Sequence, residues 1–243
     1  MKKQYLISAK IKHEEISDYN DFPFSLDFIK NLSEIEFHPN VTFIIGENGI
    51  GKSTLLEAIA LAHGLNPEGG SKNFNFSTKD THSKLYNYVR LIRGIVKSKD
   101  SFFLRGDNIY NISSEIDNLS QIDNRILKSY GGKSLHLQSH GESFLSIFLN
   151  RFGGNGLYLI DEPETALSIT SQMALLSRIH QLVQQNSQFI ICTHSPIVLS
   201  YPQSKIYQID KNCISTLTYE ETNIFGLYQA FILNKEEMLK ELL

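Results

Sequence analysis

The sequence has little cysteine, no long apolar run and no large net charge. Its two cysteines are Cys192 and Cys213. Both lie in strand-like stretches, so we expect reduced core residues of a cytosolic protein, not a disulfide framework. No apolar run is long enough to span a bilayer. The first residues, MKKQYLISAKIKHEEIS, also lack the continuous apolar core of a signal peptide. We therefore expect a cytoplasmic location without membrane insertion.

The formal net charge of -3 excludes a basic field over the whole chain. Any contact with nucleic acid would therefore need a local basic patch. Arg90, Arg93, Lys97 and Lys99 form one modest basic stretch, although such a stretch is commonly only a solvated face.

Strand-like and helix-like segments alternate over most of the chain. Apolar runs indicate strands and longer periodic segments indicate helices; the strands are expected at residues 3–11, 41–45, 156–160, 188–192 and 205–210, and the helices at 52–63 and 168–185. The alternation predicts an α/β fold with a mixed, mostly parallel sheet flanked by helices. We interpret residues 1–243 as a single domain. Residues 65–150 are expected to form an inserted helical lobe within it, with a helix over about 83–96.

A glycine-rich turn lies between a predicted buried strand and a predicted helix. Its sequence, GENGIGKS, matches the phosphate-binding pattern G-x-x-x-x-G-K-[ST]. The glycines let successive N–H groups point at a phosphate, Lys52 supplies a cation to the β- and γ-phosphates, and the Ser53 hydroxyl binds Mg²⁺. The residues expected to bind ATP are Gly46, Asn48, Gly49, Ile50, Gly51, Lys52, Ser53 and Thr54.

Two later strands also end in polar residues. In GLYLIDEPE, Asp161 would hold Mg²⁺, and Glu162 would orient and deprotonate the attacking water. In FIICTHSP, His194 could donate a hydrogen bond to the γ-phosphate. The candidate catalytic residues are therefore Lys52, Glu162 and His194, and the candidate metal ligands are Ser53 and Asp161.

The stretch LQSHGESFL predicts a helix start. Ser139 and Glu142 fit the capping-box pattern, in which each residue satisfies a backbone N–H of the other. A helix that opens with a glycine and a histidine is also a suitable place for an anion.

Together, the segments GENGIGKST, QSHGE, LYLIDEPE and CTHSP resemble, in order and spacing, the ABC class of P-loop ATPases. The resemblance covers about residues 1–210. The variants are similar to those of a soluble group: the heads of SMC-type and RecF-like proteins, the ATPase part of overcoming-lysogenisation-defect nucleases, and short stand-alone predicted ATPases of bacteria and phages. The resemblance implies a P-loop NTPase fold and an ATP hydrolase with ATP and Mg²⁺ as cofactors.

In that class two heads pair face to face, and each ATP lies between the phosphate loop of one head and the signature turn of the other. The resemblance therefore implies a homodimer in which Ser139, His140, Gly141 and Glu142 act in trans. Its expected function is a slow ATP-driven dimer switch that regulates an effector protein, in DNA repair or phage defence. The alternative is the ATPase subunit of a membrane transporter.

Some features of the transporter pattern are missing. Arg105 or Asp107 would replace the glutamine that links Mg²⁺ to the membrane partner. The aromatic residue that stacks on adenine has four candidates, which are Tyr19, Phe22, Phe24 and Phe37. Closing strands and a charged helix, NKEEMLKELL, are expected at the end of the sequence.

Overall fold

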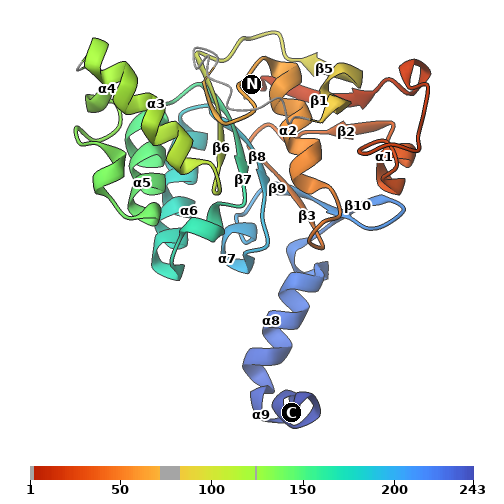
Figure 1. The fold of residues 1–243 in the computed structure, drawn as a ribbon. Coiled ribbons are helices and arrows are strands. Elements are labelled where there is room, and N and C mark those ends of the chain that lie inside the picture. Colours follow the sequence, from red (N-terminus) through yellow and green to blue (C-terminus); the bar gives the residue numbers. More distant parts are fainter. Residues whose placement is uncertain (1–2, 72–82, 124) are drawn as a thin grey trace.

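The computed structural model describes residues 3–71, 83–123 and 125–243. Figure 1 shows the arrangement of its strands and helices. The strands are β1 (Leu6–Ile11), β2 (Glu34–Glu36), β3 (Val41–Gly46), β4 (Gly70–Ser71), β5 (Val89–Arg93), β6 (Asp100–Arg105), β7 (Gly156–Asp161), β8 (Gln188–Cys192), β9 (Ser204–Ile209) and β10 (Ile214–Leu217). The helices are α1 (Asp27–Asn31), α2 (Lys52–His63), α3 (Ile109–Ile122), α4 (Arg125–Lys128), α5 (His140–Ser146), α6 (Ile169–Gln184), α7 (Pro196–Leu199), α8 (Asn223–Leu233) and α9 (Lys235–Leu242).

The main sheet has seven strands in the order β10-β9-β3-β8-β7-β6-β4. The strands from β9 to β6 are parallel, and the two edge strands are antiparallel to their neighbours. The expected mixed, mostly parallel sheet is therefore confirmed. Parallel strands are covered on both faces, which explains why the central strands are continuous apolar runs.

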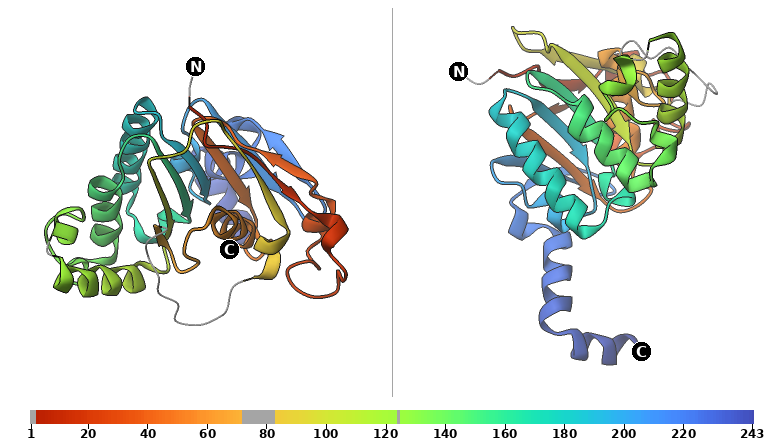
Figure 2. Two further views of the ribbon diagram at one scale, coloured as in Figure 1. Left: turned by 90° about the horizontal axis from the view of Figure 1, so that it is seen from above. Right: turned by 90° about the vertical axis from the view of Figure 1, so that its left-hand side faces the viewer.

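Alternate side chains of the central strands enter two separate cores. Phe43 of β3 lies in the first core, which is under α3, α5 and α6. Its neighbour Ile44 lies in the second core, which contains residues of α1 and α2. The same alternation continues in β7, where Tyr158 and Leu159 point to opposite cores. Figure 2 shows the helices on the two sides of the sheet.

A second sheet, with strands in the order β2-β1-β5, was not expected. Its strands are antiparallel, and it packs over α2 in the second core. The helix predicted over 83–96 is wrong: a 3-10 turn spans Lys84–Tyr88, and β5 follows it. Val89 and Leu91 contact the core with a period of two, because β5 is hydrogen-bonded to β1.

The inserted helical lobe is shorter than residues 65–150. Within that range β6 joins the main sheet, and its residues Phe102, Phe103 and Leu104 are fully buried there. The described helical part begins with α3 and ends with α5 and a π-helical continuation over Ile147–Arg151. Residues 72–82 and 124 of the expected lobe lie outside the described residues.

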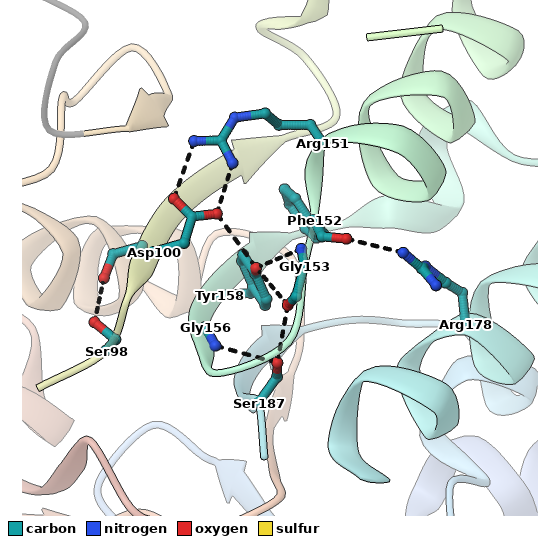
Figure 3. Close-up of polar contacts among 10 residues, drawn as sticks. Ser98, Asp100, Arg151, Phe152, Gly153, Gly156, Tyr158, Arg178 and Ser187 are labelled. Carbon is teal, nitrogen blue, oxygen red and sulfur yellow. Dashed lines mark hydrogen bonds and ion pairs between the residues drawn. The ribbon is translucent and has the colours of Figure 1, made fainter. Parts of the chain in front are cut away.

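A polar network holds the end of this continued helix against the amino ends of the strands (Figure 3). Arg151 donates to both carboxylate oxygens of Asp100, at 2.6 and 3.0 Å. Tyr158 Oη accepts from the N–H of Gly153 at 2.9 Å, and its ring stacks on Phe152 at 4.1 Å between centroids. Burial raises the pKa of Tyr158, so its hydroxyl stays a neutral donor. The helix that starts at the signature turn is therefore clamped at its far end.

The last two helices, α8 and α9, extend away from the lower side of the sheet in Figure 1 and in the right-hand view of Figure 2. The expected terminal helix is α9, whereas α8 was not foreseen. No helix in the described part of the chain is long and apolar enough to cross a membrane. Both cysteines are free, but only Cys192 is buried. Cys213 is exposed because it lies in the turn before β10, outside both cores.

Candidate active site

The predicted site residues meet at the carboxyl ends of the central strands of the main sheet. The phosphate loop follows β3, Asp161 ends β7, and His194 follows β8. Because β3, β8 and β7 are adjacent and parallel, their carboxyl ends lie side by side. The topology thus brings together the three segments that are far apart in the sequence.

The phosphate loop needs its glycines for space as well as for conformation. Gly46 has φ 151°, and a Cβ there would lie 2.5 Å from the carbonyl oxygen of Ile209. Gly51 has φ 107°, and a Cβ there would lie 2.7 Å from a methyl carbon of Leu26. The backbone of the loop is therefore packed between β9 and the segment before α1, which fixes the direction of its N–H groups.

Lys52 is buried at the start of α2. Its ammonium group donates to the carbonyl oxygens of Gly46 and Glu47, both at 3.0 Å, and so lies across the loop. Burial lowers the pKa of Lys52, and the nearby carboxylates oppose this change. Asn48 and Gly49 are exposed at the tip of the loop, Ile50 packs against the second core, and Thr54 lies in the first turn of α2.

The Ser53 hydroxyl donates to Asp161 Oδ1 at 3.1 Å. Asp161 is buried, and burial raises its pKa to about 6 against the opposing effects of Arg105 and Ser53. A hydroxyl and a carboxylate oxygen at this distance suit Mg²⁺, which usually takes only one or two protein ligands and completes its shell with phosphates and water. Among the described residues, no group of three or more His, Cys, Asp and Glu forms a metal site by itself.

Glu162 adopts a left-handed conformation, with φ 45° and ψ 59°. Such a conformation is unusual for a residue other than glycine, and it turns the chain sharply at the end of β7. The carboxylate Oε1 of Glu162 lies 3.5 Å from Nε2 of His194. Burial, with the charge of Lys52, lowers the pKa of His194, so its imidazole is neutral at pH 7. Within the described residues, this Nε2 has no hydrogen-bond partner.

Glu164 is a functional candidate that the sequence reasoning missed. The 3-10 turn over Pro163–Ala166 brings its carboxylate back to the end of β8. Oε2 accepts from the Thr193 hydroxyl at 2.7 Å, and Oε1 accepts from the backbone N–H of His194. Glu164 therefore fixes the backbone that carries His194. The signal in the sequence is the second glutamate of the segment DEPE.

A pocket of about 230 Å³ lies beside the magnesium candidates. It is lined by Ser53, Arg105, Gly106, Asp107, His140, Asp161, Glu162 and Thr165. Arg105 forms an ion pair at 2.8 Å with Glu57 of α2 and a second at 3.0 Å with Asp107. Both residues that we expected in place of the transporter glutamine are therefore in the pocket wall, where Arg105 adds a cation near Asp161.

The signature turn has the predicted capping box. Ser139 Oγ accepts from the N–H of Glu142, and the Glu142 carboxylate accepts from the N–H of Ser139 at 2.8 Å. His140, which is predicted to face a second copy, also contacts its own chain, where its Nε2 lies 2.8 Å from the carbonyl oxygen of Gly106. A Cβ on Gly141 would lie 2.6 Å from the carbonyl oxygen of Ala166. The turn thus contacts the pocket of its own chain, while Ser139, His140 and Glu142 remain exposed.

The four aromatic candidates for adenine stacking differ in exposure. Phe24 and Phe37 are buried in the second core, and Tyr19 Oη lies 2.8 Å from Nδ1 of His13. Phe22 is 64% exposed, in the segment that precedes Leu26 at the phosphate loop. Only Phe22 among the four offers a largely free ring.

Comparison with known proteins gives four findings. A profile of the AAA domain family matches residues 22–208. The chain is 27% identical over 201 residues to an uncharacterized ABC transporter ATP-binding protein of Haemophilus influenzae, which covers 72% of this chain and 74% of that protein. It is 38% identical over 85 residues to the DNA double-strand break repair Rad50 ATPase of Methanocaldococcus jannaschii. This match covers 35% of this chain and 7% of the Rad50 protein. CbiO1 from Clostridium perfringens, part of the ABC transporter complex CbiONQ, is similar in fold, with a TM-score of 0.53, 16% identity, and coverage of 98% of this chain and 100% of that chain.

Proposed function

Because this chain belongs to the AAA domain family and is an ATP-hydrolysing P-loop enzyme of the ABC class, we propose that it works as an ATP-driven dimer switch. The predicted fold class, family resemblance and enzyme class are confirmed. In the proposed cycle two copies pair face to face on ATP, and hydrolysis separates them. The cycle would regulate an effector protein in the cytoplasm. Turnover is expected to be slow, because each site is complete only in the pair.

One observation carries the proposal: Lys52, Ser53, Asp161, Glu162 and His194 converge at the carboxyl edge of three adjacent strands. We assign ATP to the loop of Gly46–Thr54 and Mg²⁺ to Ser53 and Asp161. Ser53 and Asp161 would hold the cation beside the phosphates, where its charge would offset the negative charge that develops on them. The buried carboxylate of Asp161 suits such a cation, since burial alone disfavours its negative charge.

The side chains divide the remaining chemistry between them. Lys52 would leave its loop carbonyls for the β- and γ-phosphates, and Glu162 would hold and deprotonate the attacking water. The neutral imidazole of His194 would donate to the γ-phosphate and register its loss. Phe22 is the aromatic that we assign to adenine. These roles suit an in-line transfer, in which positioning and charge stabilisation supply most of the rate.

The exposed signature turn supports the pairing of two copies. Ser139 and the N–H groups at the start of α5 would meet the γ-phosphate held by the other copy, as anions do at helix N-termini. The exposed ring of His140 would face the other copy as well, while its Nε2 holds the turn against Gly106. The pair would be symmetric about a two-fold axis and would contain two composite sites.

The decisive experiment uses Glu162→Gln. This variant should still bind ATP but fail to activate water, so sedimentation velocity with ATP and Mg²⁺ should detect a stable dimer. Ser139→Arg in the same background is the matched control, and it should bind ATP as a monomer. A Glu162→Gln chain that stays monomeric at saturating ATP would remove the face-to-face model.

A second candidate, the ATPase subunit of a membrane transporter, is favoured by the likeness to the Haemophilus influenzae protein. Co-purification with a membrane subunit would support this role. A nucleic-acid role is suggested by the likeness to Rad50 and by the exposure of Arg90, Arg93, Lys97 and Lys99. Replacement of these four residues by glutamine should then abolish DNA-stimulated ATP hydrolysis, and an absence of stimulation would remove this role.

A further inference from the structure

Helix α8 is an apolar helix that the rest of its own chain leaves uncovered. All of its 11 residues are described, and none is buried. Among them Leu227 is 64% exposed, Tyr228 is 53% exposed and Ile232 is 72% exposed. Exposed apolar surface of this extent on one element is characteristic of an interaction site.

The helix is firmly attached at its base. Thr222 is buried, and its hydroxyl caps α8 by accepting from the N–H of Phe225 at 3.3 Å. Ile224 packs against the first core, and the Tyr219 hydroxyl donates to the carbonyl oxygen of Pro196 at 3.0 Å. The projecting part of α8 is therefore presented in a defined direction.

Four exposed apolar side chains of α8 share one face, whereas a fifth, Leu233, lies on the opposite side. Leu227 and Phe231 are four residues apart, as are Tyr228 and Ile232, so all four project from neighbouring positions on successive turns. The small or polar residues Gly226, Gln229 and Ala230 fall on the other side. We call Leu227, Tyr228, Phe231 and Ile232 the α8 stripe. A continuous apolar stripe over two turns is suited to packing against another apolar surface.

The position of α8 indicates what covers the stripe. Its base contacts Pro196, which follows His194 by two residues at the carboxyl end of β8. From there α8 extends outward from the edge of the sheet that carries the candidate active site (Figures 1 and 2). A second copy that faces this edge must therefore meet α8.

The charges also favour a second copy. In a two-fold contact the same surface patch of each copy faces the other, so a stripe with charge of one sign would repel itself. The sequence of α8, NIFGLYQAFIL, contains no charged residue. In α9 the charged residues are Lys235, Lys240, Glu236, Glu237 and Glu241, which leaves an acidic excess. Helices that lie on anionic membranes carry Lys and Arg beside their apolar face, and α8 has neither.

We propose that the α8 stripe packs against the α8 stripe of a second copy. With side chains of about 200 Å², the stripe exposes roughly 450 Å² on each copy, so a pair buries at most about 900 Å². A stable interface needs about 1,200 Å² or more. The stripe contact therefore adds to another contact, and here the inference rests on the face-to-face pairing proposed above. It makes α8 a determinant of how tightly the ATP-bound dimer holds.

The test compares two faces of the same helix in the Glu162→Gln chain. Leu227→Ser combined with Phe231→Ser changes the stripe, and Leu233→Ser, which also removes an exposed apolar side chain, changes the opposite face. We expect the stripe variant to weaken the dimer in sedimentation by about tenfold or more, as loss of interface anchors does. The control should stay within about twofold, and both should bind a fluorescent ATP analogue like the parent. Equal dimer affinity in the two variants would overturn the proposal.

Cysteine cross-linking separates this inference from the ATP-dependent pairing. In a Cys213→Ser background, Phe231→Cys should form an intermolecular disulfide with an added oxidant, whereas Gln229→Cys should not. Cross-linking of Phe231→Cys in a Glu162→Gln chain that is monomeric by sedimentation would support the stripe contact while removing the ATP-dependent pairing. Equal cross-linking at the two positions, or none at Phe231→Cys, would overturn the stripe contact. Stripe-dependent flotation with phosphatidylglycerol vesicles would also overturn it, in favour of a lipid surface.

Discussion

Asp161 carries its charge in a place where burial makes ionisation costly. Its residue is 5% exposed, and burial raises its pKa from 3.8 to about 6. The unfolded chain keeps the ordinary value, so ionisation at pH 7 favours unfolding. At about 1.4 kcal/mol per pKa unit, the difference costs up to about 3 kcal/mol. Asparagine has the same shape and can still accept from the Ser53 hydroxyl. We therefore expect Asp161→Asn to raise the free energy of unfolding by up to about 3 kcal/mol at pH 7.

The gain should depend on pH in a defined direction. Between the unfolded value of 3.8 and the folded value of about 6, the folded carboxyl binds more protons than the unfolded one. The free energy of unfolding of the parent chain therefore falls, through this group, as the pH rises through that window. The advantage of Asp161→Asn should fall to about half at pH 5, and it should nearly vanish below about pH 3, where the carboxyl is neutral in the folded and the unfolded chain.

Urea unfolding followed by circular dichroism, without nucleotide and with a chelator, would measure the gain. Asp100→Asn is the matched control, because Asp100 is also partly buried but pairs with both Arg151 nitrogens. Removing its charge leaves the guanidinium without a counterion and should cost about 1–3 kcal/mol. The reasoning is refuted if Asp161→Asn destabilises the chain at pH 7, or if its gain is the same at pH 4 and pH 7. ATP hydrolysis should be lost in the more stable variant, as stability and activity are often opposed at active sites.

Three other outcomes are expected. Glu164→Ala removes the acceptor for the Thr193 hydroxyl and for the His194 N–H, so kcat should fall by about 100-fold. ATP affinity measured by calorimetry should stay nearly constant, and kcat of Glu164→Gln should lie between those of the parent and Glu164→Ala. An unchanged kcat would contradict the positioning role. Gly141→Ala introduces a Cβ 2.6 Å from the carbonyl oxygen of Ala166 and should cost about 1–3 kcal/mol in urea unfolding; equal stability would mean that the turn moves aside freely. NMR titration of His194 should give a midpoint below the usual value of about 6.5, because burial disfavours the imidazolium. The stability that the neutral imidazole contributes is present above pH 6.5 and is lost as the pH falls below it. A midpoint at or above 6.5 would contradict this prediction.

The sequence predicted the central strands because their signal is local. β3, β7 and β8 are buried on both faces, so each is a continuous apolar run that needs no knowledge of its neighbours. Helix α2 is marked by the phosphate loop before it and by Gly64 after it. In contrast, β5 is a strand only because β1 supplies its hydrogen-bond partners, and that pairing joins residues far apart in the sequence. The helix expected over 83–96 was wrong for this reason.

The candidate site was predictable where a residue follows a strand end. Asp161, Glu162 and His194 have this pattern, whereas Lys52 and Ser53 are marked by the phosphate-loop pattern before α2. All five lie at the carboxyl ends of the central strands. The position of Glu164 depends on the left-handed conformation of Glu162, which no pattern of residue types indicated. The contact of His140 with Gly106 depends on how the helical lobe is seated on the sheet, so it too required the structure.

The clamp at Arg151 determines how the signature turn can move. The helix of residues 140–151 is about 18 Å long at 1.5 Å per residue, and it is fixed at its far end by Asp100. The signature turn lies at the other end, against Gly106 and Ala166. A tilt of the helix about Arg151 would therefore displace this turn more than any other part of the helix. A tilt of about 10° about Arg151 would move Ser139 by about 3 Å, which is the length of a hydrogen bond. A small rotation of this helix about Arg151 is therefore sufficient to break a contact made at Ser139.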